Sequence, residues 1–144
     1  YEPGELRVEA RNGGNLVAED RVKTSGPAAA LKLRLEDGNV LATGEDVAIL
    51  TCWCEDEEGN PVPDASPMIH FDTNDLGKII GTGSDVCDHT PVPSLDRKMR
   101  AGLCSVVIKV FDKPGILRVY AKAEGLIPAR LDIDVHPAEK RPSL

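Results

Sequence analysis

The chain has 144 residues, of which 41% are hydrophobic and only 3% aromatic, and its formal net charge at pH 7 is −7. This length suffices for one hydrophobic core with a small additional fragment. An acidic chain with a pI of about 4.9 is repelled by nucleic acid and by anionic lipid, so we expect neither nucleic acid nor a membrane as a partner. No apolar stretch approaches the ~18 residues of a membrane-spanning helix.

The start of the chain has the pattern of a β-hairpin. Leu6, Val8 and Ala10 alternate with charged residues. The turn sequence Asn-Gly-Gly-Asn at 12–15 then leads into a second run of strand character over 16–24. A lone hairpin is only marginally stable in water, so this one requires a neighbour. Because the chain begins without Met, we expect it to be a piece of a longer protein.

Two strands with a strict alternation follow the hairpin. Leu31, Leu33 and Leu35 alternate with charged residues and predict a half-buried strand. The next strand is expected over 47–55, and its alternation gives an inner face of Ala48, Leu50, Cys52 and Cys54. Trp53 then faces outward. The acidic turn sequence over 55–61 ends this strand.

The second half of the chain continues the same pattern. Short strands are expected around Ile69 and Phe71 and over 78–80. Three longer strands have inner faces of Cys104, Val106, Ile108 and Val110, then Leu117, Val119, Ala121 and Ala123, then Leu131, Ile133 and Val135. The sequence thus predicts an all-β immunoglobulin-like sandwich of about seven strands over 28–137, preceded by the hairpin over 1–27 and followed by a flexible tail over 138–144.

The cysteines are best explained as buried thiols. Cys52 and Cys54 project to the same side of one strand, where their parallel side chains are poorly placed for a mutual disulfide. Their Cys-x-Cys spacing is not one that zinc sites favour. Cys104 is expected on a neighbouring strand, and small apolar side chains are the role that thiols commonly fill in a core.

One loop contains side chains of the kinds that bind metals. Asp85, Cys87, Asp88 and His89 could hold zinc only if the loop folded back on itself, and we interpret them as an ordinary polar loop. Thiol–imidazole catalysis would need a third orienting group and an oxyanion site, and the sequence offers neither. We therefore expect no catalytic residue, no metal ligand and no cofactor in this chain.

The aromatic side chains give the best candidates for a contact surface. Trp53 is the only tryptophan, and an outward-facing indole can stack on a sugar or pack against a neighbouring domain. We favour the domain contact over the glycan contact. Tyr120 is expected to lie near Trp53, on the outer side of its own strand. The basic run Arg97, Lys98 and Arg100 is interpreted as a solvated edge.

Several short pieces, in a fixed order, carry a family likeness. They are DVAILT at 46–51, DEEGNPVP at 56–63 with Ala65, IHF at 69–71, IIGTG at 79–83, RAGL at 100–103, PG at 114–115 and AKAEGL at 121–126. With this order and spacing, residues 31–135 resemble the C-terminal immunoglobulin-like domain of family-two glycoside hydrolases, above all β-galactosidases. After Gly83 the family tends to have an Asn-Gly-Asp turn, whereas this chain has Ser-Asp-Val-Cys-Asp at 84–88.

The hairpin adds to the resemblance. YEPGEL at 1–6 and VKTSG at 22–26 look like the final hairpin of the immunoglobulin-like domain that precedes the C-terminal one in such enzymes. The catalytic glutamates of the family lie in a (β/α)8 barrel of ~200 residues or more, so no catalytic residue is carried over to this chain. The resemblance thus implies a non-catalytic structural domain of a bacterial β-galactosidase-like hydrolase.

The resemblance also implies the partners. They would be the other domains of the parent, with contacts between copies and a weak carbohydrate contact as further options. The parent's compartment, secreted, periplasmic or cytoplasmic, is left open by the sequence. An alternative function is a bacterial surface immunoglobulin-like domain that binds a protein or a glycan, because sandwich folds serve many unrelated roles. A metal or thiol site in the 85–89 loop is a third option.

Overall fold

The computed structural model describes residues 2–138, and over that range it contains strands and turns but no helix. No helix that could cross a membrane is therefore found among these residues. The strands are β1 (Glu5–Asn12), β2 (Asn15–Lys23), β3 (Ala30–Leu35), β4 (Val40–Leu41), β5 (Val47–Glu55), β6 (Met68–Thr73), β7 (Gly77–Gly83), β8 (Asp96–Lys98), β9 (Leu103–Val110), β10 (Gly115–Lys122) and β11 (Ala129–His136). Of the tail expected over 138–144, residues 139–144 lie outside the described residues.

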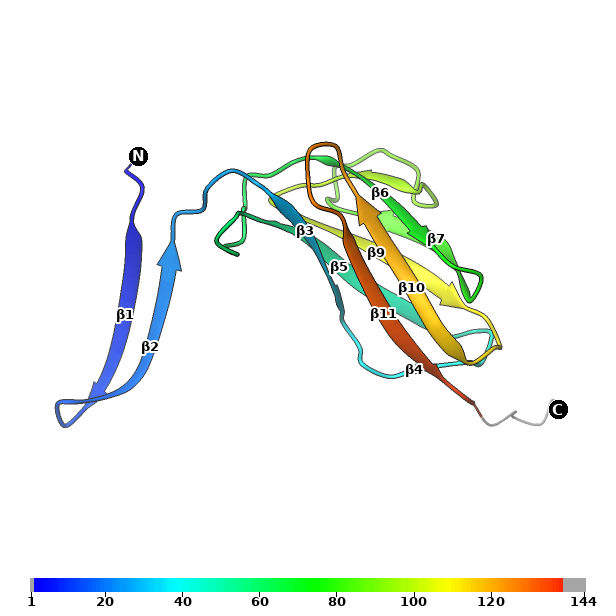
Figure 1. Cartoon of the computed structure of the whole chain (residues 1–144), viewed down its shortest axis with the longest axis horizontal. Coiled ribbons are helices and arrows are strands. Elements are labelled where there is room, and N and C mark those ends of the chain that lie inside the picture. Colours follow the sequence, from blue (N-terminus) through cyan, green and yellow to red (C-terminus); the bar gives the residue numbers. More distant parts are fainter. Residues whose placement is uncertain (1, 139–144) are drawn as a thin grey trace.

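Strands β3–β11 form a sandwich of two sheets, and β1–β2 form a separate hairpin beside it (Figure 1). One sheet has four strands in the order β3-β5-β9-β7, and the other has five in the order β4-β11-β10-β6-β8. All pairs are antiparallel except β11 with β4. This architecture confirms the predicted all-β immunoglobulin-like sandwich.

The expected count of about seven sandwich strands is too low, because the sandwich has nine. The two additional strands, β4 and β8, contain only two and three residues, too few for an alternating pattern to be visible in the sequence. The strand expected over 78–80 also extends further, to Gly77–Gly83. Its pairing with β9 shifts register between Ile79 and Gly81, and this bulge interrupts the alternation.

The core lies between the two sheets and consists almost entirely of aliphatic side chains. In β5 the expected inner residues are all buried, with Leu50 and Cys52 fully shielded from solvent. In β9 and β10, Ile108 and Leu117 are equally shielded. Phe71 of β6 is the one phenylalanine in this layer. Each buried Å² of apolar surface contributes about 25 cal/mol, so the stacked inner faces are the main source of stability.

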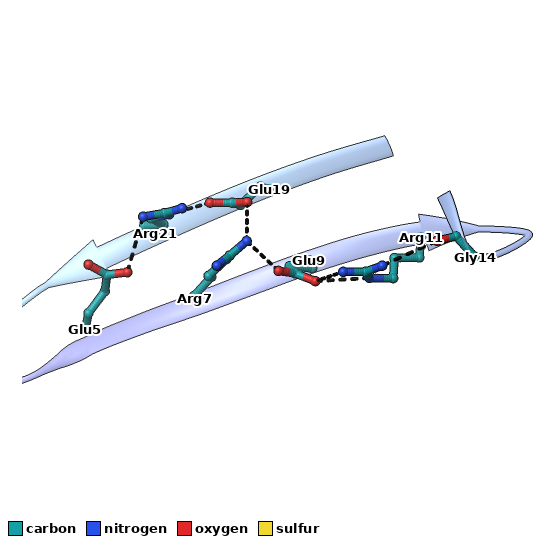
Figure 2. Close-up of polar contacts among 7 residues, drawn as sticks. All are labelled: Glu5, Arg7, Glu9, Arg11, Gly14, Glu19 and Arg21. Carbon is teal, nitrogen blue, oxygen red and sulfur yellow. Dashed lines mark hydrogen bonds and ion pairs between the residues drawn. The ribbon is translucent and has the colours of Figure 1, made fainter. Parts of the chain in front are cut away.

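The hairpin has two chemically different faces, and neither is covered. Every residue of β1 and β2 is exposed. Figure 2 shows the charged face, where Arg7 contacts both Glu9 and Glu19 at 2.6 and 2.7 Å. The opposite face presents Leu6 and, directly across from it, Val22, which are 67% and 65% exposed. An exposed apolar face of this kind is typical of a surface that packs against another protein segment.

The hairpin is connected to the sandwich through Asp56, just after β5. Its carboxylate accepts hydrogen bonds from the backbone N–H groups of Gly26, Glu58 and Asn60 at 2.8, 2.9 and 2.8 Å. The Asn60 side-chain amide and then the Gly26 N–H lower the pKa of Asp56 to about 2. Lys23 at the end of β2 forms an ion pair with Glu58 in the same turn. The linker is thus held at a defined place on the sandwich.

The core assignment predicts opposite outcomes for two adjacent residues of β9. Ile108 is fully buried, whereas Lys109 is directed outward and pairs with Glu45 at 3.1 Å. Ile108→Asp places an unpaired charge in the core and should leave the chain unfolded, because a domain has only about 5–15 kcal/mol of stability. Lys109→Asp should change the free energy of unfolding by about 1 kcal/mol or less. Urea denaturation followed by circular dichroism measures both, and similar losses would refute the assignment.

A second prediction concerns Asp56→Ala, which leaves the N–H groups of the linker and turn without their acceptor. We expect a lower free energy of unfolding at pH 7. Since the pKa of Asp56 is about 2 in the folded chain and ~3.9 in unfolded chains, its contribution is complete above pH ~4 and declines toward pH ~2. The difference in the free energy of unfolding between Asp56→Ala and wild type, measured by urea denaturation, should therefore shrink as the pH falls from ~4 to ~2.

The control for this experiment is Asp64→Ala, an exposed carboxylate in the same connection. Its free energy of unfolding should follow that of the wild type at every pH. A difference between Asp56→Ala and wild type that stays constant down to pH ~2 would contradict the assigned role of the carboxylate.

Candidate functional site

Trp53 lies in a groove on the outer face of the four-stranded sheet. Its strand, β5, places Cys52 and Cys54 in the core, so alternation directs the indole outward, where it is half-buried. The indole N–H donates to the Glu55 carboxylate at 2.9 Å. The groove encloses about 480 Å³ and is lined by Arg34, Thr51, Trp53, Glu55, Pro61, Val62, Pro63, Ala101, Gly102 and Leu103. These residues are called the Trp53 groove below.

A close backbone approach shapes one end of the groove. Gly102 has a φ of +72°, and a Cβ there would lie 2.4 Å from the carbonyl oxygen of Val62. Only glycine accommodates both the positive φ and the close approach of the Val62 carbonyl. The turn before β9 therefore packs directly against the 61–63 segment. Leu103, the first residue of β9, is opposite Trp53 in the strand register and is 50% exposed.

Tyr120 does not lie near Trp53, contrary to the expectation from the sequence. Its strand, β10, belongs to the five-stranded sheet, where it pairs with β6 and β11 and not with β5. Leu117 and Val119 of β10 are buried, so Tyr120 faces outward on the opposite side of the sandwich. The two aromatic side chains therefore cannot form one platform. Alternation gave the direction of each ring correctly, but it does not indicate to which sheet a strand belongs.

The outer faces of the two sheets differ in chemistry around the two aromatic side chains, although the five-stranded sheet also exposes apolar residues such as Met68 of β6. Around Tyr120 the face is charged, since Asp132 pairs with Arg130 at 2.6 Å and lies 4.0 Å from Arg118. The four-stranded sheet instead exposes apolar side chains between its polar ones, among them Leu103 and Ile49, which is 45% exposed. A charged face is compatible with water, whereas an apolar face is typical of a contact surface.

In the basic run before β9, Lys98 and Arg100 are exposed as expected, but Arg97 is only 2% exposed and is not part of a solvated edge. Its guanidinium donates to the Asp88 carboxylate at 2.7 Å and to the Thr82 hydroxyl at 3.1 Å. It also donates to the carbonyl oxygens of Thr90 and Pro91 at 3.2 and 3.0 Å. A buried charge needs such partners, and no sequence pattern indicated them. Arg97 thus fastens the loop between β7 and β8.

This role of Arg97 also explains the loop that contains potential metal ligands. Asp88 is held by Arg97 and by the Thr90 N–H, which together keep the pKa of the Asp88 carboxyl below its usual range. Asp85 accepts from the Cys87 N–H at 2.7 Å, as in an ordinary turn. Among residues 2–138, no group of three or more His, Cys, Asp or Glu side chains is arranged to hold a metal ion.

Cys52, Cys54 and Cys104 are buried and unbridged, as expected, whereas Cys87 is exposed in the loop between β7 and β8. Cys52 and Cys104 are register partners on β5 and β9, and both occur as free thiols. The contact with Cys104, together with burial, raises the pKa of the Cys52 thiol. Burial raises the pKa of Cys54 to about 11. Neutral thiols are poor nucleophiles, so these side chains fill space in the core.

Comparison with known proteins identifies relatives of the chain. The family model for the glycoside hydrolase family 2 C-terminal domain 5 matches residues 31–132. The chain is 36% identical over 138 residues to the β-galactosidase BoGH2A of Bacteroides ovatus, an alignment that covers 92% of this chain and 16% of that protein. The chain is therefore far shorter than this relative.

Solved structures share the fold. A family 2 glycosyl hydrolase of Bacteroides cellulosilyticus superposes with a TM-score of 0.82 at 22% identity, covering 92% of this chain and 18% of the other. A β-glycosidase of Bacteroides vulgatus gives 0.84 at 21% identity, covering 94% and 18%. The match to the family model extends from β3 into β11 and so includes most of the sandwich. The chain thus belongs to the glycoside hydrolase family 2 C-terminal domain 5 family.

Proposed function

We propose that this chain is a non-catalytic accessory domain of a β-galactosidase-like glycoside hydrolase. The observation that carries the proposal is the 36% identity with BoGH2A, which extends over 92% of this chain but only 16% of that protein. A chain of this size cannot include the (β/α)8 barrel that bears the catalytic carboxylates in the family. The family match favours this function over a surface immunoglobulin-like domain.

The state of two carboxylates supports a structural role. Glycoside hydrolysis needs a pair of carboxyl groups, one of which is a general acid with a raised pKa. Asp56 and Asp88 have lowered pKa values, and both are occupied by hydrogen-bond donors of the chain itself. These two groups stabilise a connection and a loop, which suits a domain that supplies architecture to its neighbours.

The resemblance of the hairpin to the end of a preceding domain extends the proposal. We propose that β1 and β2 are the last two strands of an immunoglobulin-like domain on the N-terminal side, and that the sandwich follows after the 24–29 linker. The apolar side chains of the hairpin are consistent with this, because in this chain they are exposed to solvent.

Two truncations of the longer hydrolase that contains this chain test the proposal. Ending the polypeptide after Pro27 removes the sandwich but keeps the hairpin, so we expect cleavage of 4-nitrophenyl β-D-galactopyranoside at 20 °C, with a melting temperature lower by several degrees. Ending it before residue 1 also removes the hairpin and opens the preceding domain, so far less folded enzyme should be recovered. The 144-residue chain alone should release no nitrophenol.

The proposal would be refuted by turnover in the 144-residue chain. It would also be refuted by a longer polypeptide that carries no glycosidase activity at all. Equal stability and yield for the two truncations would refute only the assignment of the hairpin to the preceding domain.

A further inference from the structure

We propose that the Trp53 groove is the docking site for the domain that the β1–β2 hairpin completes, and not a glycan site. This inference rests on the proposed function, since it requires a preceding domain in the same polypeptide. It goes further by specifying which surface of the sandwich that domain covers.

The hairpin indicates on which of its sides the preceding domain lies. Its charged face is already satisfied, because Arg7 pairs with both Glu9 and Glu19 within that face. Its other face exposes Leu6, Val8 and Val22, which are 67%, 61% and 65% accessible, with Asp20 across from Val8 as its one charged residue within β1 and β2. A domain gains stability by covering the apolar face and gains little by covering the charged one. We therefore place the body of the preceding domain against the apolar face.

The apolar surface of the hairpin continues into the Trp53 groove. Leu6 and Val22 line a hollow of about 830 Å³ at the base of the hairpin, together with Pro61 and Pro63 of the sandwich; its charged lining residues are Glu2, Glu5, Arg21 and Lys23. The same two prolines line the Trp53 groove. A domain that covers the hairpin side chains and fills this hollow therefore reaches the prolines and, immediately beyond them, the indole.

The linker holds the hairpin close to the end of β5. Gly26 is held by the Asp56 carboxylate at 2.8 Å, and the Ala29 N–H donates to the Glu55 carbonyl oxygen at 2.8 Å. Both acceptors lie at the end of β5, two and three residues after Trp53. The hairpin is thus anchored beside the groove, and the domain attached to it has little freedom to move elsewhere.

The chemistry of the groove fits a protein surface better than a sugar. Glycan sites combine aromatic rings with polar groups that are free to bond hydroxyls, and here the indole N–H already donates to Glu55. The Glu55 carboxylate also lies 3.5 Å from the Lys32 amine. Of the other polar side chains that line the groove, Arg34 is paired with Glu36 at 3.0 Å and Thr51 is half-buried. The rest of the lining is largely apolar, with the indole face, two prolines and the half-exposed Leu103. Such surfaces pack against apolar side chains, and Trp is favoured at interfaces of this kind.

Hydroxyl-radical footprinting of the longer polypeptide and of the 144-residue chain tests the docking site. Oxidation of Trp53 should fall at least threefold in the longer polypeptide, because the preceding domain covers the ring. Oxidation of Tyr120, the half-buried aromatic on the opposite face, should be the same in both. This pair of results supports the proposal.

Three other results would overturn it. If Leu6 and Val22 are protected but Trp53 is not, the preceding domain covers the hairpin but does not contact the groove. Protection of Trp53 that requires added galacto-oligosaccharide would make the groove a sugar site. Protection that grows with the concentration of the 144-residue chain alone would identify a second copy as the occupant.

A substitution gives an independent readout. Leu103→Glu puts a charge into the proposed contact, so in the longer polypeptide proteolysis of the 24–29 linker should accelerate several-fold. In the 144-residue chain the same substitution should have little effect on the melting temperature, because Leu103 is half exposed there. Met68→Glu, at 57% exposure on the five-stranded sheet, is the matched control and should leave the linker unchanged. Equal acceleration by both variants would contradict the proposal.

Discussion

The packing of two stripes of aliphatic side chains is the constraint on which the rest of the structure depends. In an extended backbone every second residue faces the same way, so each strand can contribute only alternate positions to the space between the sheets. Leu50, Val106 and Ile108 meet that requirement with complete burial. Most polar side chains are therefore displaced to the outer faces, the loops and the hairpin, with Arg97 and Thr82 as buried exceptions that bond to each other. The contacts of this domain with other parts of a protein must form on those outer surfaces.

The sequence was sufficient for most of the fold because this constraint is local. The inner residues of β5 and β9 can be read from a window of eight residues, and the turn at 12–15 marks the hairpin without ambiguity. Failures occurred where the decisive partner is distant. The assignment of β10 to the five-stranded sheet depends on its pairing with β6 and β11, so the predicted nearness of Tyr120 to Trp53 was wrong although its outward direction was right.

Arg97 illustrates the same limit at the level of a single side chain. In the sequence it belongs to a basic run beside a short strand, and exposure is the ordinary expectation for such a residue. Its burial depends on Asp88 and on two carbonyl groups contributed by a loop. No spacing rule links these positions. The Trp53 groove was likewise only partly predicted from the sequence. The outward direction of the indole was predicted, but the adjoining prolines lie in the connection between β5 and β6, whose path has no local sequence pattern.

The burial of Arg97 also separates the shape of the β7–β8 loop from the identity of its outermost residues. The guanidinium binds the Thr82 hydroxyl in β7 and the backbone carbonyls of Thr90 and Pro91 later in the segment, while Val86 is fully exposed. Substitutions at such exposed positions can thus accumulate at little energetic cost while the base keeps its conformation. The β7–β8 loop therefore combines a base of fixed conformation with exposed residues that can vary. Evolution can change the surface chemistry of such a loop without disturbing the fold.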